Sequence, residues 1–164
     1  MTEEVKGKIL VLFVMVFALL NSCMVYNSFQ DTYNLDALSG KRLYYLDDFE
    51  SLKSEKEICD YIKSRVSYRK NEAFKACDPA ETLSRGYGDC QDFTILFMNI
   101  AFFALNKKYN AIAVDGNKRS VINGGFPNHL IAESKNGKQI DPQGCQYTDY
   151  TVMYRYTFDE IFSY

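Results

Sequence analysis

The chain of 164 residues has little of what several common protein classes require. It contains one histidine, three prolines and nine glycines, and no run of lysines or arginines. So little proline and glycine, with 47% hydrophobic and 24% charged residues, excludes a collagen-like or low-complexity chain. A net charge of −2 without a basic cluster gives no support to nucleic-acid binding. The single histidine and the lack of a Cys-x-x-Cys pair argue against a zinc site, and we expect no metal and no cofactor.

The apolar run near the N-terminus is short for a membrane span. Residues 9–20 form an unbroken run of 12 apolar residues, whereas a span takes about 20 residues and a signal-peptide core about 7–15. Together with Cys23, the segment resembles a bacterial lipoprotein signal, in which that cysteine is lipidated and becomes the new N-terminus. We therefore expect a signal peptide over 1–22 and an exported protein held at the membrane of the bacterial cell envelope. A plain cleaved signal, or an uncleaved anchor over 9–26, is left open.

The rest of the chain divides into a lead segment and one domain. Residues 23–47 are polar, rich in tyrosine and asparagine, and without a sustained apolar period. We expect them to form an irregular tether that holds the domain off its membrane. From residue 48 onward the apolar spacing becomes regular, so 48–164 is predicted to be the single domain.

Within this domain, helical patterns precede strand-like ones. Apolar residues at spacings of three and four predict a helix over 48–68, and a more uniformly apolar stretch predicts a buried helix over 90–106. Residues 71–85 are expected to connect them, because Pro79 disfavours a helical residue before it. Alternating runs then predict strands at 110–114, 129–133, 137–141 and 151–157. This order of elements predicts an α+β fold with an antiparallel sheet.

One cysteine lies where the surroundings favour its thiolate. Cys90 occupies the first turn of the predicted buried helix, where unpaired N–H groups and the helix dipole stabilise an anion. His129 begins one predicted strand and Asp141 ends the next, so a hairpin would bring them together. The imidazole can then take the thiol proton, and the carboxylate can orient the ring. Taken singly, the residues leave open that Cys90 only packs at a helix start and that the other two have ordinary surface or turn roles.

Three motifs in a fixed order make the pattern more specific. A Gly-x-Cys-x-Asp loop precedes a long helix, a His-bearing strand follows, and another strand ends in Asp-Pro. In this chain the motifs are Gly88-Asp89-Cys90-Gln91-Asp92, Asn128-His129-Leu130-Ile131-Ala132-Glu133 and Ile140-Asp141-Pro142. The segment from about Glu57 to Gly144 thereby resembles the transglutaminase-like superfamily of cysteine enzymes. The resemblance implies a papain-like core, with the nucleophile helix packed against an antiparallel sheet, and a catalytic triad of Cys90, His129 and Asp141.

The same resemblance implies acyl transfer through a thioester, with an amide bond of a peptide or protein as substrate. Water as the acceptor gives a cysteine peptidase or amidase, which is the activity we expect. A lysine amine as the acceptor gives a crosslinking transglutaminase. The alternative from another class is a non-catalytic envelope protein that binds peptide or glycan.

Several other residues have no single interpretation from sequence. Cys59, Cys77 and Cys145 are candidates for a disulfide in an exported protein, and their spacing does not select a pair. Tyr68 is a candidate donor to the oxyanion of an acyl-transfer reaction, with core packing as the alternative. Asp92 is left open between a capping role and an orienting role. The oligomeric state is not set by the sequence.

Overall fold

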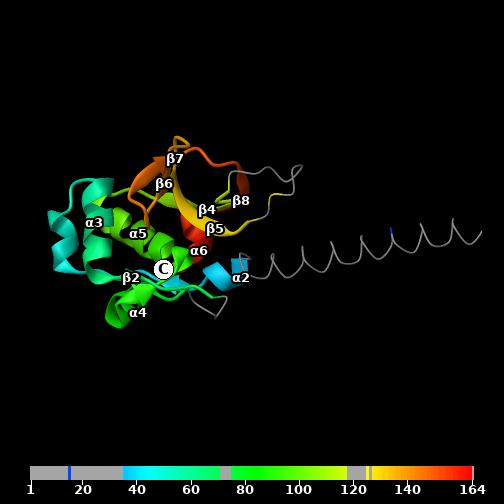
Figure 1. The fold of residues 1–164 in the computed structure, drawn as a ribbon. Helices are drawn as coiled ribbons and strands as arrows, with labels where there is room; N and C mark the ends of the chain where they lie inside the picture. The colour runs from blue at the N-terminus through cyan, green and yellow to red at the C-terminus, as the bar shows by residue number, and fades with distance from the viewer. Residues whose placement is uncertain (1–14, 16–34, 71–74, 118–124, 126, 164) are drawn as a thin grey trace, which may run out of the picture.

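The computed structural model describes residue 15 and residues 35–70, 75–117, 125 and 127–163. Figure 1 shows a five-stranded sheet on one side of the fold, with the helices α3, α4 and α5 gathered on the other. The predicted signal peptide (1–22, with residue 15 alone described), the lipidation candidate Cys23 and the first part of the predicted tether lie outside the described residues. Among the helices that are described, none has the length and apolar character needed to cross a membrane.

The sheet consists of antiparallel strands in the order β7-β6-β5-β4-β8. Four strands lie where the alternation predicts them, within two residues at each end. The strand β7 is missed by the sequence because its residues are largely exposed and carry no apolar alternation. The combination of helices with an antiparallel sheet confirms the predicted α+β class. The strand bounds are β4 (Tyr109–Val114), β5 (His129–Ser134), β6 (Gln139–Asp141), β7 (Gln146–Thr148) and β8 (Val152–Tyr156).

The helix α5 (Cys90–Leu105) forms the centre of the core and confirms the helix predicted over 90–106. Every residue from Cys90 to Ala101 is buried, because α3 and the strands β4 and β5 all pack against this helix. Oγ1 of Thr94 donates to the backbone carbonyl of Leu130 at 2.9 Å, which ties the helix to β5. The helix ends at Asn106 in a left-handed conformation, with φ of 52°.

The single helix predicted over 48–68 is wrong as a continuous element. The chain forms a short 3₁₀ helix, η1 (Asp47–Ser51), and then α3 (Glu55–Arg65), with a break between them. Ser54 starts α3, because its side chain accepts the backbone N–H of Glu57 at 3.2 Å. The apolar residues on both sides of the break face the same core, so their spacing alone does not reveal it.

The connection predicted over 71–85 contains a further helix, α4 (Pro79–Arg85). Proline disfavours helical structure before it, yet at the first helical position its missing N–H breaks no helical hydrogen bond. The helix ends at Gly86, which has φ of 71°. The strand β3 (Tyr87–Gly88) follows, pairs in parallel with β2 (Ser67–Tyr68), and leads directly into α5.

Residues 35–46, expected to be part of the tether, pack onto the domain instead. The helix α2 (Leu35–Leu38) contacts α6 (Phe158–Ile161), and β1 (Lys41–Arg42) pairs in parallel with β9 (Phe162–Ser163). The domain boundary predicted at residue 48 is therefore too late. These elements are too short to produce an apolar period, and their partners lie at the other end of the domain.

Two polar contacts fasten this segment to the core. Lys41 is only 3% exposed, and its Nζ donates to the backbone carbonyl of Ala76 at 2.5 Å. The side chain of Asn99, buried in α5, accepts the backbone N–H of Tyr44 at 2.8 Å and donates to the carbonyl of Tyr44 at 2.7 Å. Because both contacts satisfy buried polar groups, the segment is part of the folded unit.

Candidate active site

Cys90 is the first residue of α5 and lies on a firmly capped N-terminus. Asp89 is the N-cap, and its Oδ1 accepts the backbone N–H groups of Gln91 and Asp92 at 2.9 and 3.2 Å. In return, Oδ2 of Asp92 accepts the backbone N–H of Asp89 at 3.1 Å, which completes a reciprocal capping box. These bonds fix the backbone that carries the Cys90 thiol.

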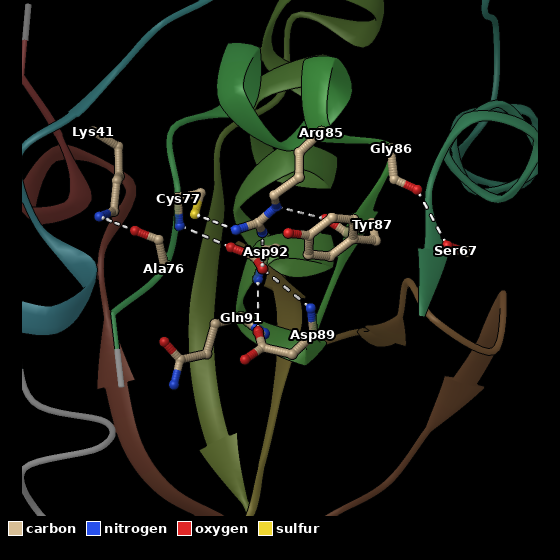
Figure 2. Close-up of polar contacts among 10 residues, drawn as sticks. All are labelled: Lys41, Ser67, Ala76, Cys77, Arg85, Gly86, Tyr87, Asp89, Gln91 and Asp92. Carbon is tan, nitrogen blue, oxygen red and sulfur yellow. Dashed lines mark hydrogen bonds and ion pairs between the residues drawn. The ribbon is translucent and has the colours of Figure 1, made fainter. Parts of the chain in front are cut away.

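Asp92 is fully buried and is held by residues that precede the helix (Figure 2). Its Oδ1 accepts the backbone N–H of Cys77 at 2.7 Å, and its Oδ2 accepts Nη2 of Arg85 at 2.8 Å. The Arg85 guanidinium also donates to the carbonyl of Tyr87 at 3.0 Å and lies 4.6 Å from the centre of its ring. A Cβ at Gly88 would lie 2.6 Å from Cβ of Asp92, so only glycine fits there. Asp92 therefore caps and anchors the helix.

His129 and Asp141 come from neighbouring antiparallel strands, as the sequence predicts. Ala132 in β5 lies opposite Ile140 in β6, and this register places Asp141 opposite Ile131. His129 is two residues away on the same face, so the two side chains are diagonal neighbours. Nε2 of His129 lies 3.0 Å from Oδ2 of Asp141. The expected meeting of these two residues is confirmed.

Cys90 joins the pair at the imidazole, so all three predicted residues come together. His129 hydrogen-bonds with Cys90 as well as with Asp141. Burial opposes the charged ring, but these hydrogen bonds and the negative charges of both partners raise the pKa of His129 to about 10. Because Nε2 faces Asp141, Nδ1 is the ring nitrogen that is available to the thiol. The surroundings therefore favour an imidazolium at neutral pH.

Asp141 is fixed as an ionised acceptor behind the ring. Burial tends to raise the pKa of Asp141, but the hydrogen bond and charge of His129 and two backbone N–H groups hold it below its usual value. These N–H groups belong to Gln143 and Gly144 and reach Oδ1 at 3.0 and 3.5 Å. Oδ2 is thereby left for His129.

Sequence reasoning misses one ring that packs against the imidazole. The ring of Tyr150 lies edge-on to that of His129, with centroids 6.5 Å apart and an interplanar angle of 84°. Gln139, which is 9% exposed, holds the backbone of Tyr150 at both groups. Its Nε2 donates to the carbonyl at 2.9 Å, and its Oε1 accepts the N–H at 2.8 Å. Tyr150 is one of four tyrosines between residues 147 and 156, so nothing in the sequence singles it out, and only the fold brings it to the histidine.

Tyr68 borders the exposed side of the site. It pairs with Gly88 across the short parallel ladder, two residues before Cys90. Its ring lies 6.4 Å from that of Phe93, and the residue is 49% exposed. Burial, and after it the charge of Cys90, raises the pKa of Tyr68. The hydroxyl keeps its proton at neutral pH, as a hydrogen-bond donor to an oxyanion requires; that role stays a prediction.

Neither a metal site among the described residues nor a similar protein indicates what this site does. Within the described ranges, no group of three or more His, Cys, Asp or Glu side chains is arranged to hold a metal ion. Comparison of the chain with family models, curated proteins and solved structures finds no significant match. The function of the site is therefore inferred from the chemistry of its own residues.

Proposed function

We propose that the protein is a cysteine-dependent acyl-transfer enzyme that hydrolyses amide bonds of peptides or proteins. It would be a cysteine peptidase or amidase with a papain-like core of the transglutaminase-like type. The observation that carries the proposal is His129, which is hydrogen-bonded to Asp141 at 3.0 Å and to Cys90 at the start of a buried helix. A peptide- or glycan-binding module needs no such series of thiol, imidazole and carboxylate. The order of the motifs and the packing of α5 against an antiparallel sheet support the same assignment.

In the first half-reaction, Sγ of Cys90 attacks the carbonyl carbon of the amide. A C–S bond forms, and the electron pair of the C=O bond moves to the oxygen. The N–H groups of Gln91 and Asp92 already donate to Asp89, so we assign the Tyr68 hydroxyl as a donor to this oxyanion. His129 then gives its proton to the leaving nitrogen, the C–N bond breaks, and a thioester remains.

In the second half-reaction, the neutral ring of His129 takes a proton from water as the water oxygen attacks the thioester carbon. The C–S bond breaks, the carboxylic acid is released, and thiolate and imidazolium are restored. Asp141 keeps Nε2 occupied throughout, so that Nδ1 faces the reacting atoms. A lysine amine in place of water would give an isopeptide, the transglutaminase outcome.

The test is incubation of the purified protein with a peptide library, with and without a primary amine, followed by mass spectrometry. We expect cleaved or deamidated peptides in both samples and none with Cys90→Ala. Cys77→Ala is the matched control and should retain activity, because the variant keeps the backbone N–H that Asp92 accepts, and Arg85, which loses one hydrogen bond to the sulfur, keeps its bonds to Asp92 and Tyr87. Products that carry the amine would reassign the acceptor, and activity that survives Cys90→Ala would refute the proposal.

We further propose that the enzyme acts in the bacterial cell envelope, attached to the membrane through lipid on Cys23. The support is the short apolar run over 9–20, preceded by two lysines and followed closely by that cysteine. Cys23→Ser should release the protein from membranes into the soluble fraction. Retention of this variant in the membrane would instead favour an uncleaved anchor.

A further inference from the structure

A pair of thiols lies directly behind the turn that holds Asp141. Cys59 is fully buried on α3, and Cys145 ends the turn between β6 and β7 with φ of 54°. The Cys145 Sγ is 4.0 Å from Oδ1 of Asp60, the residue next to Cys59, and its side chain packs on the core cluster that contains Cys59. Burial raises the pKa of Cys59, and the charge of Cys145 and a hydrogen bond that the Cys59 thiol donates to Cys145 raise it further, so the two thiols face each other.

The other two described cysteines, Cys77 and Cys90, interact with different residues. Cys77 lies before α4, where its Sγ accepts Nη1 of Arg85 at 3.0 Å, and Cys90 interacts with His129. None of the four described cysteines is in a disulfide in this structure. Of the three pairings that the sequence leaves open among Cys59, Cys77 and Cys145, the geometry therefore brings one pair into contact.

We infer that Cys59 and Cys145 form the disulfide of this protein and that the bond locks the turn that presents Asp141. The backbone N–H groups of Gln143 and Gly144, which hold Oδ1 of Asp141, lie within two residues of Cys145. A bond to α3 would keep these donors in place and so keep the carboxylate aimed at His129. The consequence for catalysis rests on the proposed function, whereas the pairing itself does not.

The oxidant is a small disulfide such as oxidised glutathione. Cys145, the more exposed thiol, attacks one sulfur of that disulfide as the thiolate, forming a mixed disulfide and releasing one small thiol. Cys59 then loses its proton to solvent, which its raised pKa makes the slower step, and its sulfur attacks Sγ of Cys145; the second small thiolate leaves and is protonated. The two protein thiols lose two electrons and two protons, which convert the small disulfide into two thiols.

The pairing is tested by exposing the full chain to oxidised glutathione and mapping its peptides without reductant. We expect one linked pair of peptides, containing Cys59 and Cys145, that reductant separates. Cys145→Ser and Cys59→Ala should each abolish the link, and Cys77→Ser should leave it unchanged. A link that includes Cys77, or a folded chain in which Cys59 and Cys145 stay unlinked, would overturn the inference.

Two further readouts separate the disulfide from the proposed enzyme. Closing a loop of 87 residues, both cysteines included, should raise the Tm of the oxidised protein by roughly 5–10 °C over the reduced one, with no such difference for Cys145→Ser. Amide exchange at Gln143 and Gly144 should also slow on oxidation. If these changes occur but no amide is hydrolysed, the proposed function fails and the disulfide stands; if hydrolysis is found without the link, the reverse holds.

Discussion

At the scale of single residues, His129 is the member of the candidate site whose pKa is shifted most strongly. Its neighbours raise its pKa in the folded protein to about 10, from an ordinary value of 6.5. A raised pKa means that protonation of the ring stabilises the folded state, fully so below about pH 6.5. This stabilisation is lost as the pH rises through about 10.

Replacing this residue should therefore remove a pH-dependent part of the stability. We expect the difference in unfolding free energy between wild type and His129→Gln to decrease by on the order of 3 kcal/mol between about pH 6.5 and pH 10. Urea unfolding at a series of pH values measures it. Groups that titrate elsewhere in the protein cancel in this difference, so a constant difference over that range would show that the ring is not held protonated.

Tyr150 should position the imidazole without taking part in the reaction. Removing its ring with Tyr150→Ala leaves one face of His129 without its packing partner, and we expect kcat to fall about 10-fold while KM changes little. Tyr150→Phe keeps the ring and should keep kcat. Steady-state kinetics of both variants tests this, and equal losses for Ala and Phe would mean that the hydroxyl, rather than the packing, matters.

At the scale of elements, the start of α5 depends on a buried ion pair between Arg85 and Asp92 (Figure 2). Arg85→Gln leaves the Asp92 carboxylate buried without its counter-charge, which should cost about 3 kcal/mol. Arg65→Gln is a matched control, because its guanidinium also bonds an aspartate, Asp48, at 2.8 Å and lies 4.4 Å from the centre of a tyrosine ring.

The control pair is exposed on both sides, and its loss should cost less than about 1 kcal/mol. Chemical denaturation of the two variants compares the costs directly. If the buried Asp92 depends on its counter-charge, Arg85→Gln should be clearly the less stable of the two variants. Similar losses would mean that the burial of Asp92 contributes nothing to the strength of its pair.

The elements that the sequence predicts are those with long internal patterns. The helix α5 and the strands β4 and β5 bury most of their length, so their composition identifies them. The break before α3 depends on one capping serine, and α4 depends on a proline that starts rather than stops a helix. In a sequence, a serine is consistent with a helix cap or with an ordinary helical position, and a proline with the start or the end of a helix. Tertiary contacts decide between these alternatives.

The candidate site follows the same division. The sequence predicts where the three candidate residues lie because of the elements that carry them. Cys90 begins a helix, and the adjoining ends of two antiparallel strands carry His129 and Asp141. The contacts of Tyr150 and Arg85 are not predictable, since each depends on how separate segments meet in space. Sequence therefore predicts the three residues of the candidate site, and the structure adds the residues that hold them.

At the scale of the whole molecule, the two ends of the described domain support each other. In Figure 1, α2 lies beside α6. The short strand β1 pairs with β9 near the C-terminus. Leu38 and Lys41 are buried in this region. The folded unit therefore begins before the boundary at residue 48 that composition suggests.

Truncation should reveal this boundary. A chain that starts at residue 48 should be at least about 3 kcal/mol less stable than one that starts at residue 35, because it lacks the buried Leu38 and the contacts of Lys41 and Tyr44. Thermal unfolding by circular dichroism measures both. Equal stability of the two chains would show that residues 35–46 are not part of the folded domain.

Activation of the Cys90 thiol is measured most directly by the rate at which iodoacetamide modifies each cysteine of the fully reduced protein at about pH 6.5, well below the value near 8.5 where an ordinary thiol ionises. Cys90 is more buried than Cys77 or Cys145, so exposure alone would make it the slower one. We predict that Cys90 reacts at least about 10-fold faster than either, and that His129→Gln removes this advantage. A Cys90 that reacts no faster than the other two, or whose rate does not change with His129→Gln, would contradict the account.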